Sequence, residues 1–169
     1  MPETPESLLA RLSAQGIEAI THHHPPLHTV VESKELRGDL PGLHVKNLFL
    51  RTKPPQPFLL VVAEEDTPLS INALGRRLGT GRLSMANEQE LWERLGVRPG
   101  SVTPLALINA PAGSIRLVMD HRLLDGAGPV NVHPLTNTAT TALRPADLRL
   151  FLEGLGHRPE PIDLTAPLA

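Results

Sequence analysis

The segment that decides the fold reads HVKNLFL at residues 44–50, followed by KPPQP at 53–57 and FLLVVA at 58–63. The two apolar runs have the length and the aliphatic and aromatic content of strands. The prolines between them favour a turn, because proline donates no backbone hydrogen bond to a sheet. We therefore predict a β-hairpin at this point in the chain.

Further helices and strands are predicted on both sides of the hairpin. Thr4 as an N-cap before Pro5, leucines at helical spacing and Gly16 at the end predict an amphipathic N-terminal helix. Because strands come in runs, with helices at the start, middle and end, the fold class is α+β: one domain with a mixed, largely antiparallel sheet and flanking helices. The other expected helices are 31–36, 71–78, 87–95 and 145–156, and the other extended segments are 17–21, 105–109, 115–120, 130–133 and 140–143.

Length and composition limit the kind of protein. The 169 residues fit a single domain, 1–169, whose last part, 158–169, is a proline-containing tail. The absence of cysteine excludes a disulfide framework and a cysteine nucleophile, and it favours a reducing compartment, so we expect a cytoplasmic protein. The N-terminus contains no long apolar run, which predicts neither a secretory signal nor a membrane span.

The charge balance disfavours a generic nucleic-acid-binding protein. Sixteen Lys and Arg residues stand against eighteen Asp and Glu residues, and only 2% of the residues are aromatic. The composition therefore disfavours broad phosphate neutralisation and a base-stacking platform, and any contact with RNA must be local. Candidates for such phosphate contacts are Lys53, Arg76, Arg77 and Arg82.

Lys46 is the first candidate for chemistry. Period-two alternation puts it on the same strand face as Leu48 and Leu50, where a lysine is unusual. Its stem could pack at the strand end while the ammonium reaches water. Alternatively, the ammonium could lie at the mouth of a cavity and hold a phosphate or ester oxygen.

The segment GSVTP at 100–104 is the second candidate. Glycine permits a positive φ and close approach of a ligand, proline stiffens the exit, and the amides between them could face an anion or an oxyanion. An ordinary connecting loop would have the same composition.

Histidines and hydroxyl groups form the third candidate. The segment NVHPLTNTATT at 131–141 combines His133 with many polar side chains, either as part of a site or as a turn stabilised by Asn and Thr hydrogen bonds. The run His22-His23-His24 suggests a metal site, but consecutive histidines in an extended chain point to opposite faces and no HExxH pattern is present. We expect neither a metal nor another cofactor.

Taken in order, four motifs resemble the freestanding prolyl-tRNA editing family, which is related to the editing domain inserted in bacterial prolyl-tRNA synthetases. They are HPP at 24–26 with Thr29, VKNLFL at 45–50, GVRPGSVTPL at 96–105 and HPLTNTAT at 133–140. The resemblance extends from about residue 4 to about residue 164. One departure is His28, where an aromatic or apolar residue is expected before Thr29.

The resemblance implies an aminoacyl-tRNA editing fold with a small pocket for the aminoacylated 3′ end of tRNA. It implies that Lys46 engages the terminal phosphate region and that Gly100 to Pro104 line the ester and the attacking water. His133 together with Asn137 favours removal of alanine. The implied catalytic residues are Lys46, Gly100, Ser101 and His133, and the implied substrate-binding residues are Thr29, Asn47, Val102, Thr103, Pro104, Thr136 and Asn137.

The expected function is therefore metal-independent trans-editing of tRNA(Pro), most simply the hydrolysis of Ala-tRNA(Pro), with proline excluded by its bulk. The expected partners are the 3′ acceptor end of tRNA(Pro) and, transiently, prolyl-tRNA synthetase. Three alternatives stay open at this point. They are the same chemistry on cysteine or serine, a non-catalytic binder of aminoacyl-tRNA or of the synthetase, and a histidine-dependent metallohydrolase.

Overall fold

The computed structural model describes residues 1–26 and 40–165. Within them the chain forms five α-helices, one 3₁₀ helix and eight strands. The helices are α1 Pro5–Ala14, α3 Ile71–Leu78, α4 Glu88–Leu95, η1 Pro104–Asn109, α5 Arg122–Asp125 and α6 Pro145–Gly154. The strands are β1 Ile20–His23, β2 Leu43–Arg51, β3 Phe58–Glu64, β4 Ser84–Met85, β5 Ile115–Asp120, β6 Val130–Val132, β7 Ala139–Leu143 and β8 Glu160–Ile162.

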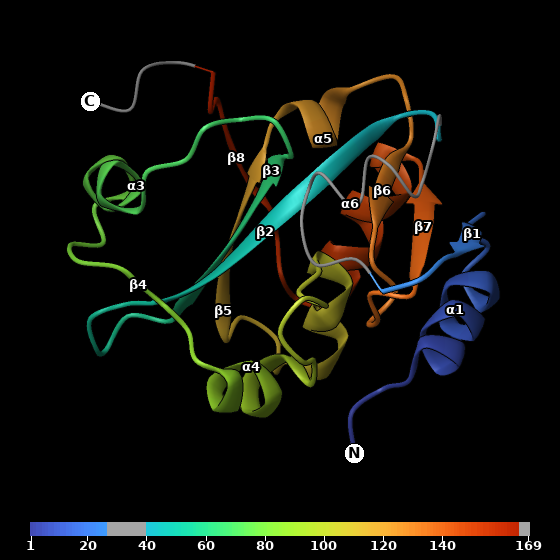
Figure 1. Cartoon of the computed structure of the whole chain (residues 1–169), viewed down its shortest axis with the longest axis horizontal. Helices are drawn as coiled ribbons and strands as arrows, with labels where there is room; N and C mark the ends of the chain where they lie inside the picture. Colours follow the sequence, from blue (N-terminus) through green and yellow to red (C-terminus); the bar gives the residue numbers. More distant parts are fainter. Residues whose placement is uncertain (27–39, 166–169) are drawn as a thin grey trace.

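The strands form one mixed sheet in the order β1-β7-β6-β2-β3-β5-β8, with β4 paired to β2. Among the described residues, four of the seven pairings are antiparallel and three are parallel. Strand β2 crosses the centre of the molecule, with α3 at one end of the long axis and α1 at the other (Figure 1). The predicted α+β class with a mixed sheet and flanking helices is confirmed.

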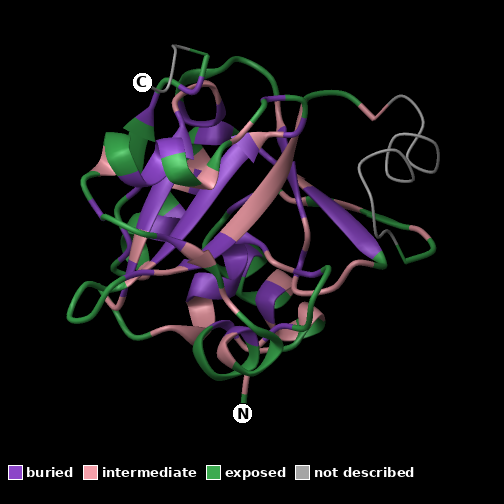
Figure 2. Ribbon diagram, turned by 60° about the vertical axis from the view of Figure 1, so that its left-hand side comes forward, coloured by how far each residue is buried: buried purple, intermediate pink, exposed green. Residues whose placement is uncertain are grey.

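The predicted hairpin is β2–β3, in which Lys46 pairs with Ala63 and Asn47 with Val62. Side chains alternate between the two faces of these strands, and each face meets its own hydrophobic core. The larger core contains Phe49, Leu60 and Val62 together with apolar side chains of α1, α4, η1 and α6. The smaller core contains Leu50, Leu59 and Val61 together with side chains of α3, β5 and β8. Figure 2 shows the buried strands between the more exposed helices.

Helix ends follow the local signals in the sequence. The side chain of Asn87 accepts a hydrogen bond from the amide of Glu90, and the Glu90 carboxylate accepts one from the amide of Asn87, so α4 begins with a capping box. Gly79 and Gly96 end α3 and α4 in the left-handed conformation that glycine adopts without strain.

The strand predicted at 105–109 is wrong, because this segment is the 3₁₀ helix η1. Pro104 occupies its first turn, and the Thr103 hydroxyl accepts a hydrogen bond from the amide of Leu105 at 3.3 Å. A short buried apolar run does not by itself distinguish a strand from a helix.

Several other boundaries differ from the expectation. The extended segment predicted at 17–21 forms a strand only from Ile20 to His23, and the C-terminal tail contains β8, which pairs in parallel with β5. Strand β4 and helix α5 were not predicted. The helix predicted at 31–36 lies outside the described residues. In the part of the chain that is described, none of the helices is both long and apolar enough to cross a bilayer.

Candidate functional site

Strand β2 contacts the loop 100–104 through Asn47. The Asn47 side-chain amide donates a hydrogen bond of 3.0 Å to the carbonyl of Val102. The other side-chain atom, Oδ1, is buried and has no hydrogen-bond partner among the described residues. Since buried polar atoms are nearly always paired, this free acceptor is a position where a ligand or a water can bind.

Gly100 brings the loop 100–104 next to the segment that follows His133. It has a φ of +86°, and a Cβ at this position would lie 3.3 Å from the Nδ2 atom of Asn137. A larger residue would therefore be strained and would also push against Asn137. The absence of a side chain at Gly100 lets two segments far apart in the sequence approach each other.

The amides of the loop divide into bound and free groups. The Ser101 amide donates to the carbonyl of Arg98 at 3.0 Å, which closes the turn and removes this amide as a donor to a ligand. The amides of Gly100, Val102 and Thr103 have no acceptor among the residues that the structure describes. These three, and not Ser101, are the amides that could bind an oxyanion.

His133 is held in one tautomer. Its Nδ1 lies 3.2 Å from the carbonyl oxygen of Ala139, which can only accept, so Nδ1 carries the proton and Nε2 is an acceptor in the neutral ring. Burial lowers the pKa of His133 below its ordinary value of 6.5, and repulsion from His24 lowers it further, although the Ala139 carbonyl opposes both. The ring is therefore neutral at pH 7.

Strained backbone and local hydrogen bonds shape the turn after His133. Leu135 has a φ of +66° and is the one non-glycine residue with positive φ in the described chain. Such strain is often stored at functional sites. The hydroxyls of Thr136 and Thr138 are 3.0 Å apart, and the Thr136 hydroxyl also accepts from the Thr138 amide. These Thr contacts fit the turn-stabilising role that the sequence left open.

His24 joins the first motif to the last. Its amide donates to the carbonyl of Thr138 at 2.9 Å, and its Nε2 lies 2.8 Å from the hydroxyl of Thr140. Together with the Asn47–Val102 and Gly100–Asn137 contacts, this links all four sequence motifs in one connected region. Thr29 and His28 lie outside the described residues.

Lys46 is on the face of β2 that carries Leu48 and Leu50 and meets the smaller core, whereas Val102 packs against the larger core. That its amine borders the same recess as the loop 100–104 stays a prediction. Lys46 is half-buried, and its ammonium makes no hydrogen bond or ion pair with the described residues.

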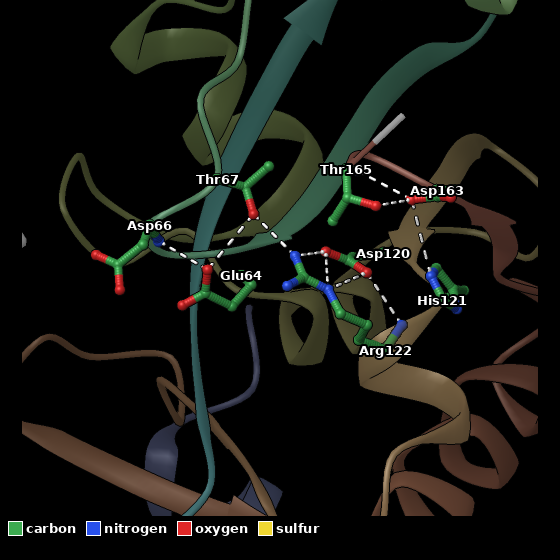
Figure 3. Close-up of polar contacts among 8 residues, drawn as sticks. All are labelled: Glu64, Asp66, Thr67, Asp120, His121, Arg122, Asp163 and Thr165. Atoms are coloured by element: carbon green, nitrogen blue, oxygen red, sulfur yellow. Dashed lines mark hydrogen bonds and ion pairs between the residues drawn. The ribbon is translucent and has the colours of Figure 1, made fainter. Parts of the chain in front are cut away.

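A second polar cluster was not predicted from the sequence (Figure 3). Asp120 is fully buried at the end of β5, and the guanidinium of Arg122 donates to its carboxylate at 2.6–3.1 Å. Arg122 also donates to the hydroxyl of Thr67, which donates in turn to Glu64. A cavity of about 640 Å³ lies beside Arg122.

The groups of this second cluster hold one another. Burial alone would raise the pKa of Asp120, but the hydrogen bonds and charge of Arg122 outweigh burial, and the pKa lies below its ordinary value. Three consecutive acidic residues, Glu64 to Asp66, have oxygens within 4.8 Å of one another and could hold a cation. That acidic triplet is visible in the sequence, whereas the Asp120–Arg122–Thr67 contacts depend on the fold. We regard the cluster as a structural link between β5, α5 and the β3–α3 loop.

Comparison with known proteins identifies the family. The family model of the aminoacyl-tRNA editing domain matches residues 24–151, which include the four sequence motifs. The chain belongs to the aminoacyl-tRNA editing domain family. The resemblance drawn from the sequence motifs is thereby confirmed.

Two proteins, one of Danio rerio and one of Acetoanaerobium sticklandii, are similar to this chain over most of their length. The chain is 42% identical to prolyl-tRNA synthetase associated domain-containing protein 1 of Danio rerio, over 91% of this chain and 82% of the relative. It is 30% identical to the prolyl-tRNA editing protein ProX of Acetoanaerobium sticklandii, over 94% of this chain and 96% of that protein. A crystal structure of a candidate trans-editing enzyme for prolyl-tRNA synthetase aligns with this chain at a TM-score of 0.67 and 21% identity. The alignment covers 96% of this chain and 99% of the other, and it supports the editing-domain fold.

Proposed function

We propose that this protein hydrolyses the ester of a mischarged tRNA(Pro), with alanine as the amino acid removed and without a metal. The observation that carries the proposal is the connected region in which Asn47, the loop 100–104 and the segment 133–140 meet. Family membership supports the reaction class. The absence of cysteine fits a reducing compartment, and we propose that the reaction takes place in the cytoplasm.

In the proposed reaction, a water oxygen attacks the ester carbonyl carbon, and the bond to the ribose oxygen breaks. The free amides of Gly100, Val102 and Thr103 are the candidates to stabilise the oxyanion. The 2′-hydroxyl of the terminal adenosine relays a proton from the water to the leaving 3′-oxygen. A thousandfold acceleration requires about 4 kcal/mol, which one or two oxyanion donors can supply at roughly 3 kcal/mol each.

The remaining polar groups of the region would bind the amino acid and the nucleotide. The Nε2 atom of neutral His133 and the free Oδ1 of Asn47 are both acceptors, which suits the ammonium group of the amino acid. The ammonium of Lys46 has no partner among the described residues and belongs to the face of β2 opposite to Asn47. We propose that it binds the phosphate of the terminal nucleotide. Ser101, Thr103, Pro104 and Thr136 would shape the site through the backbone, and Thr29 is proposed as a contact by resemblance alone.

The test is a deacylation panel with Ala-, Cys-, Ser- and Pro-tRNA(Pro). The wild type is expected to clear Ala-tRNA(Pro) and to spare Pro-tRNA(Pro), since a sieve excludes the larger ring. Lys46→Ala is expected to lose at least about a hundredfold in rate, which corresponds to roughly 2.7 kcal/mol. Lys53→Ala, measured at saturating tRNA, is the matched control because Lys53 is exposed in the hairpin turn. Intact Ala-tRNA(Pro) after incubation with folded wild-type protein would overturn the proposal.

A non-catalytic binder is the second candidate, and two observations favour it. The Ser101 amide is already bound to the carbonyl of Arg98, and Lys46 belongs to the face of β2 opposite to Asn47. Single-turnover deacylation with protein in excess separates the two functions, because a binder protects the ester while an enzyme cleaves it.

A further inference from the structure

Positive charge is concentrated in one part of this slightly acidic protein. From Thr67 to Asn87 the chain contains three arginines and no acidic residue, although the net charge of the whole chain is −2. The three arginines, Arg76, Arg77 and Arg82, are all exposed. The segment folds as α3, a glycine-rich turn and β4.

The fold gathers part of this charge around a cavity of about 630 Å³ between α3 and the turn that follows it. Arg76 and Arg82 line the cavity. The backbone of the turn comes very close to the helix, since a Cβ at Gly75 would lie 2.5 Å from the carbonyl oxygen of Gly81. The remaining lining residues are Asn72, Gly75, Gly79, Gly81 and Leu83, none of them acidic.

The arginines of this groove differ from several others in the chain. Arg51, Arg116 and Arg122 each form an ion pair with a carboxylate. Arg76 and Arg82, by contrast, make no ion pair or side-chain hydrogen bond with the residues that the structure describes. The C-terminal dipole of α3 accounts for a basic residue at Arg76, but Arg82 lies beyond the helix and has no such explanation.

The groove is connected to the candidate site through β2. Strand β4 follows the groove and pairs with the end of β2, with Leu50 opposite Met85. Asn47 lies three residues before Leu50 on β2, about 10 Å along the strand at ~3.3 Å per residue, and its side chain is on the face of the sheet opposite to α3. A ligand that reaches both places must therefore be extended and must pass from one face of the sheet to the other.

We propose that the groove between α3 and the turn that follows it, lined by Arg76 and Arg82, binds backbone phosphates of the tRNA acceptor arm while the 3′ end occupies the candidate site. This inference rests on the proposed function for the identity of the RNA. Guanidinium groups suit phosphate because they present paired donors in a planar fork. Two neutralised phosphates would also explain how an acidic protein holds RNA, namely by a local contact.

The test measures binding of uncharged tRNA(Pro) by fluorescence anisotropy, with no turnover required. The double variant Arg76→Ala/Arg82→Ala is expected to weaken binding at least about tenfold and to reduce the slope of log K against log salt by roughly 1.8, since each neutralised phosphate contributes about 0.9. The matched control is Arg11→Ala/Arg149→Ala, which removes the same charge from α1 and α6, both away from α3 (Figure 1). The control is expected to bind within about twofold of wild type.

Each outcome decides the inference. Wild-type affinity and slope in the groove variant, equal losses in the control, or no salt-dependent binding by the wild type would overturn it. Inorganic phosphate at constant ionic strength is the second arm, because release of RNA at low millimolar phosphate would indicate a site for the free anion and overturn the RNA assignment. Deacylation is measured separately. If binding depends on the groove arginines but the wild type does not cleave the ester, only the proposed function is refuted. If both variants cleave the ester and bind as tightly as the wild type, only the groove inference is refuted.

Discussion

Two polar regions of this molecule are built in opposite ways. Around Asp120, the buried carboxylate is neutralised by Arg122, and Arg122 also donates to Thr67. Around Asn47, a buried oxygen and three loop amides have no partner in the described part of the chain. A folded protein gains nothing from unpaired polar groups, so their concentration in one region indicates where a ligand supplies the partners.

The difference predicts which substitutions change stability and which change activity. Variants in the Asp120 cluster should unfold more easily while the folded fraction stays active. Variants around Asn47 should stay folded and lose activity. The following experiments test this separation, from the largest expected effect to the smallest.

Arg122→Ala is expected to lower the free energy of unfolding by about 2–3 kcal/mol. Losing one partner of a fully buried pair typically costs about 3–5 kcal/mol, but the Arg122 side chain is 34% exposed, so water partly compensates. Denaturant titration gives the value. Arg144→Ala is the control, because its pair with Asp147 is on the surface. An equal loss in both variants would show that the Asp120 cluster is no more than a surface network.

Asn47→Leu is expected to reduce deacylation about 10- to 100-fold and to change the unfolding free energy by less than about 1 kcal/mol. The substitution removes one hydrogen bond but also removes a buried oxygen without a partner. Asn131→Leu is the matched control, because Asn131 is buried and its amide donates to Pro41 and Leu43. The control should lose stability and keep its rate per folded molecule; the reverse pattern would contradict the comparison.

Acidification from pH 7 to pH 5 is expected to destabilise the protein. Burial lowers the pKa of both His133 and His157 below 6.5, so the unfolded chain binds these protons first, and stability declines as the pH falls below about 6.5. Each histidine contributes at most ~1.4 kcal/mol per pH unit. His157→Leu should make thermal stability less sensitive to pH and leave the pH profile of deacylation unchanged, since His157, unlike His133, lies outside the candidate site. If the melting temperature of the variant depends on pH as that of the wild type does, His157 does not contribute to the loss of stability at low pH.

Asn87→Ala is expected to reduce stability by about 1 kcal/mol because it removes the N-cap of α4. Asn87→Ser should retain most of the stability. Asn87 belongs to neither polar region, so this pair of variants measures an ordinary local hydrogen bond against which the other effects can be judged. Both variants should deacylate at the wild-type rate per folded molecule.

The sequence predicted the parts of the fold that depend on neighbouring residues. The hairpin and the helices expected at 71–78 and 87–95 follow from local chemistry, and the structure contains them as β2–β3, α3 and α4. Strand β8 was missed because its short segment becomes a strand only by pairing with β5, some 40 residues earlier. The segment 105–109 was misassigned because burial on all sides removes the periodicity that distinguishes a helix from a strand.

The site was predictable in its parts but not in its contacts. The motifs indicated Asn47, the loop 100–104 and His133, and the structure connects them. The assignment of Ser101 as a donor could not be checked from the sequence, because its amide is engaged by a turn that depends on backbone geometry. The alternation that separates Lys46 from Asn47 was visible, but only the two cores reveal what each face meets.

The pairing of strand β2 has a consequence for the proposed RNA substrate. The strand is held by β6 at its start, by β3 along most of its length and by β4 at its end. A strand paired in this way resists stretching and sliding, which holds β4, next to the α3 groove, in a fixed register with the segment of β2 that contains Asn47. Under the proposed function, the fold would therefore select the length of the acceptor arm. An RNA whose acceptor arm is lengthened or shortened by one base pair should still bind, but its ester should be displaced from the loop 100–104.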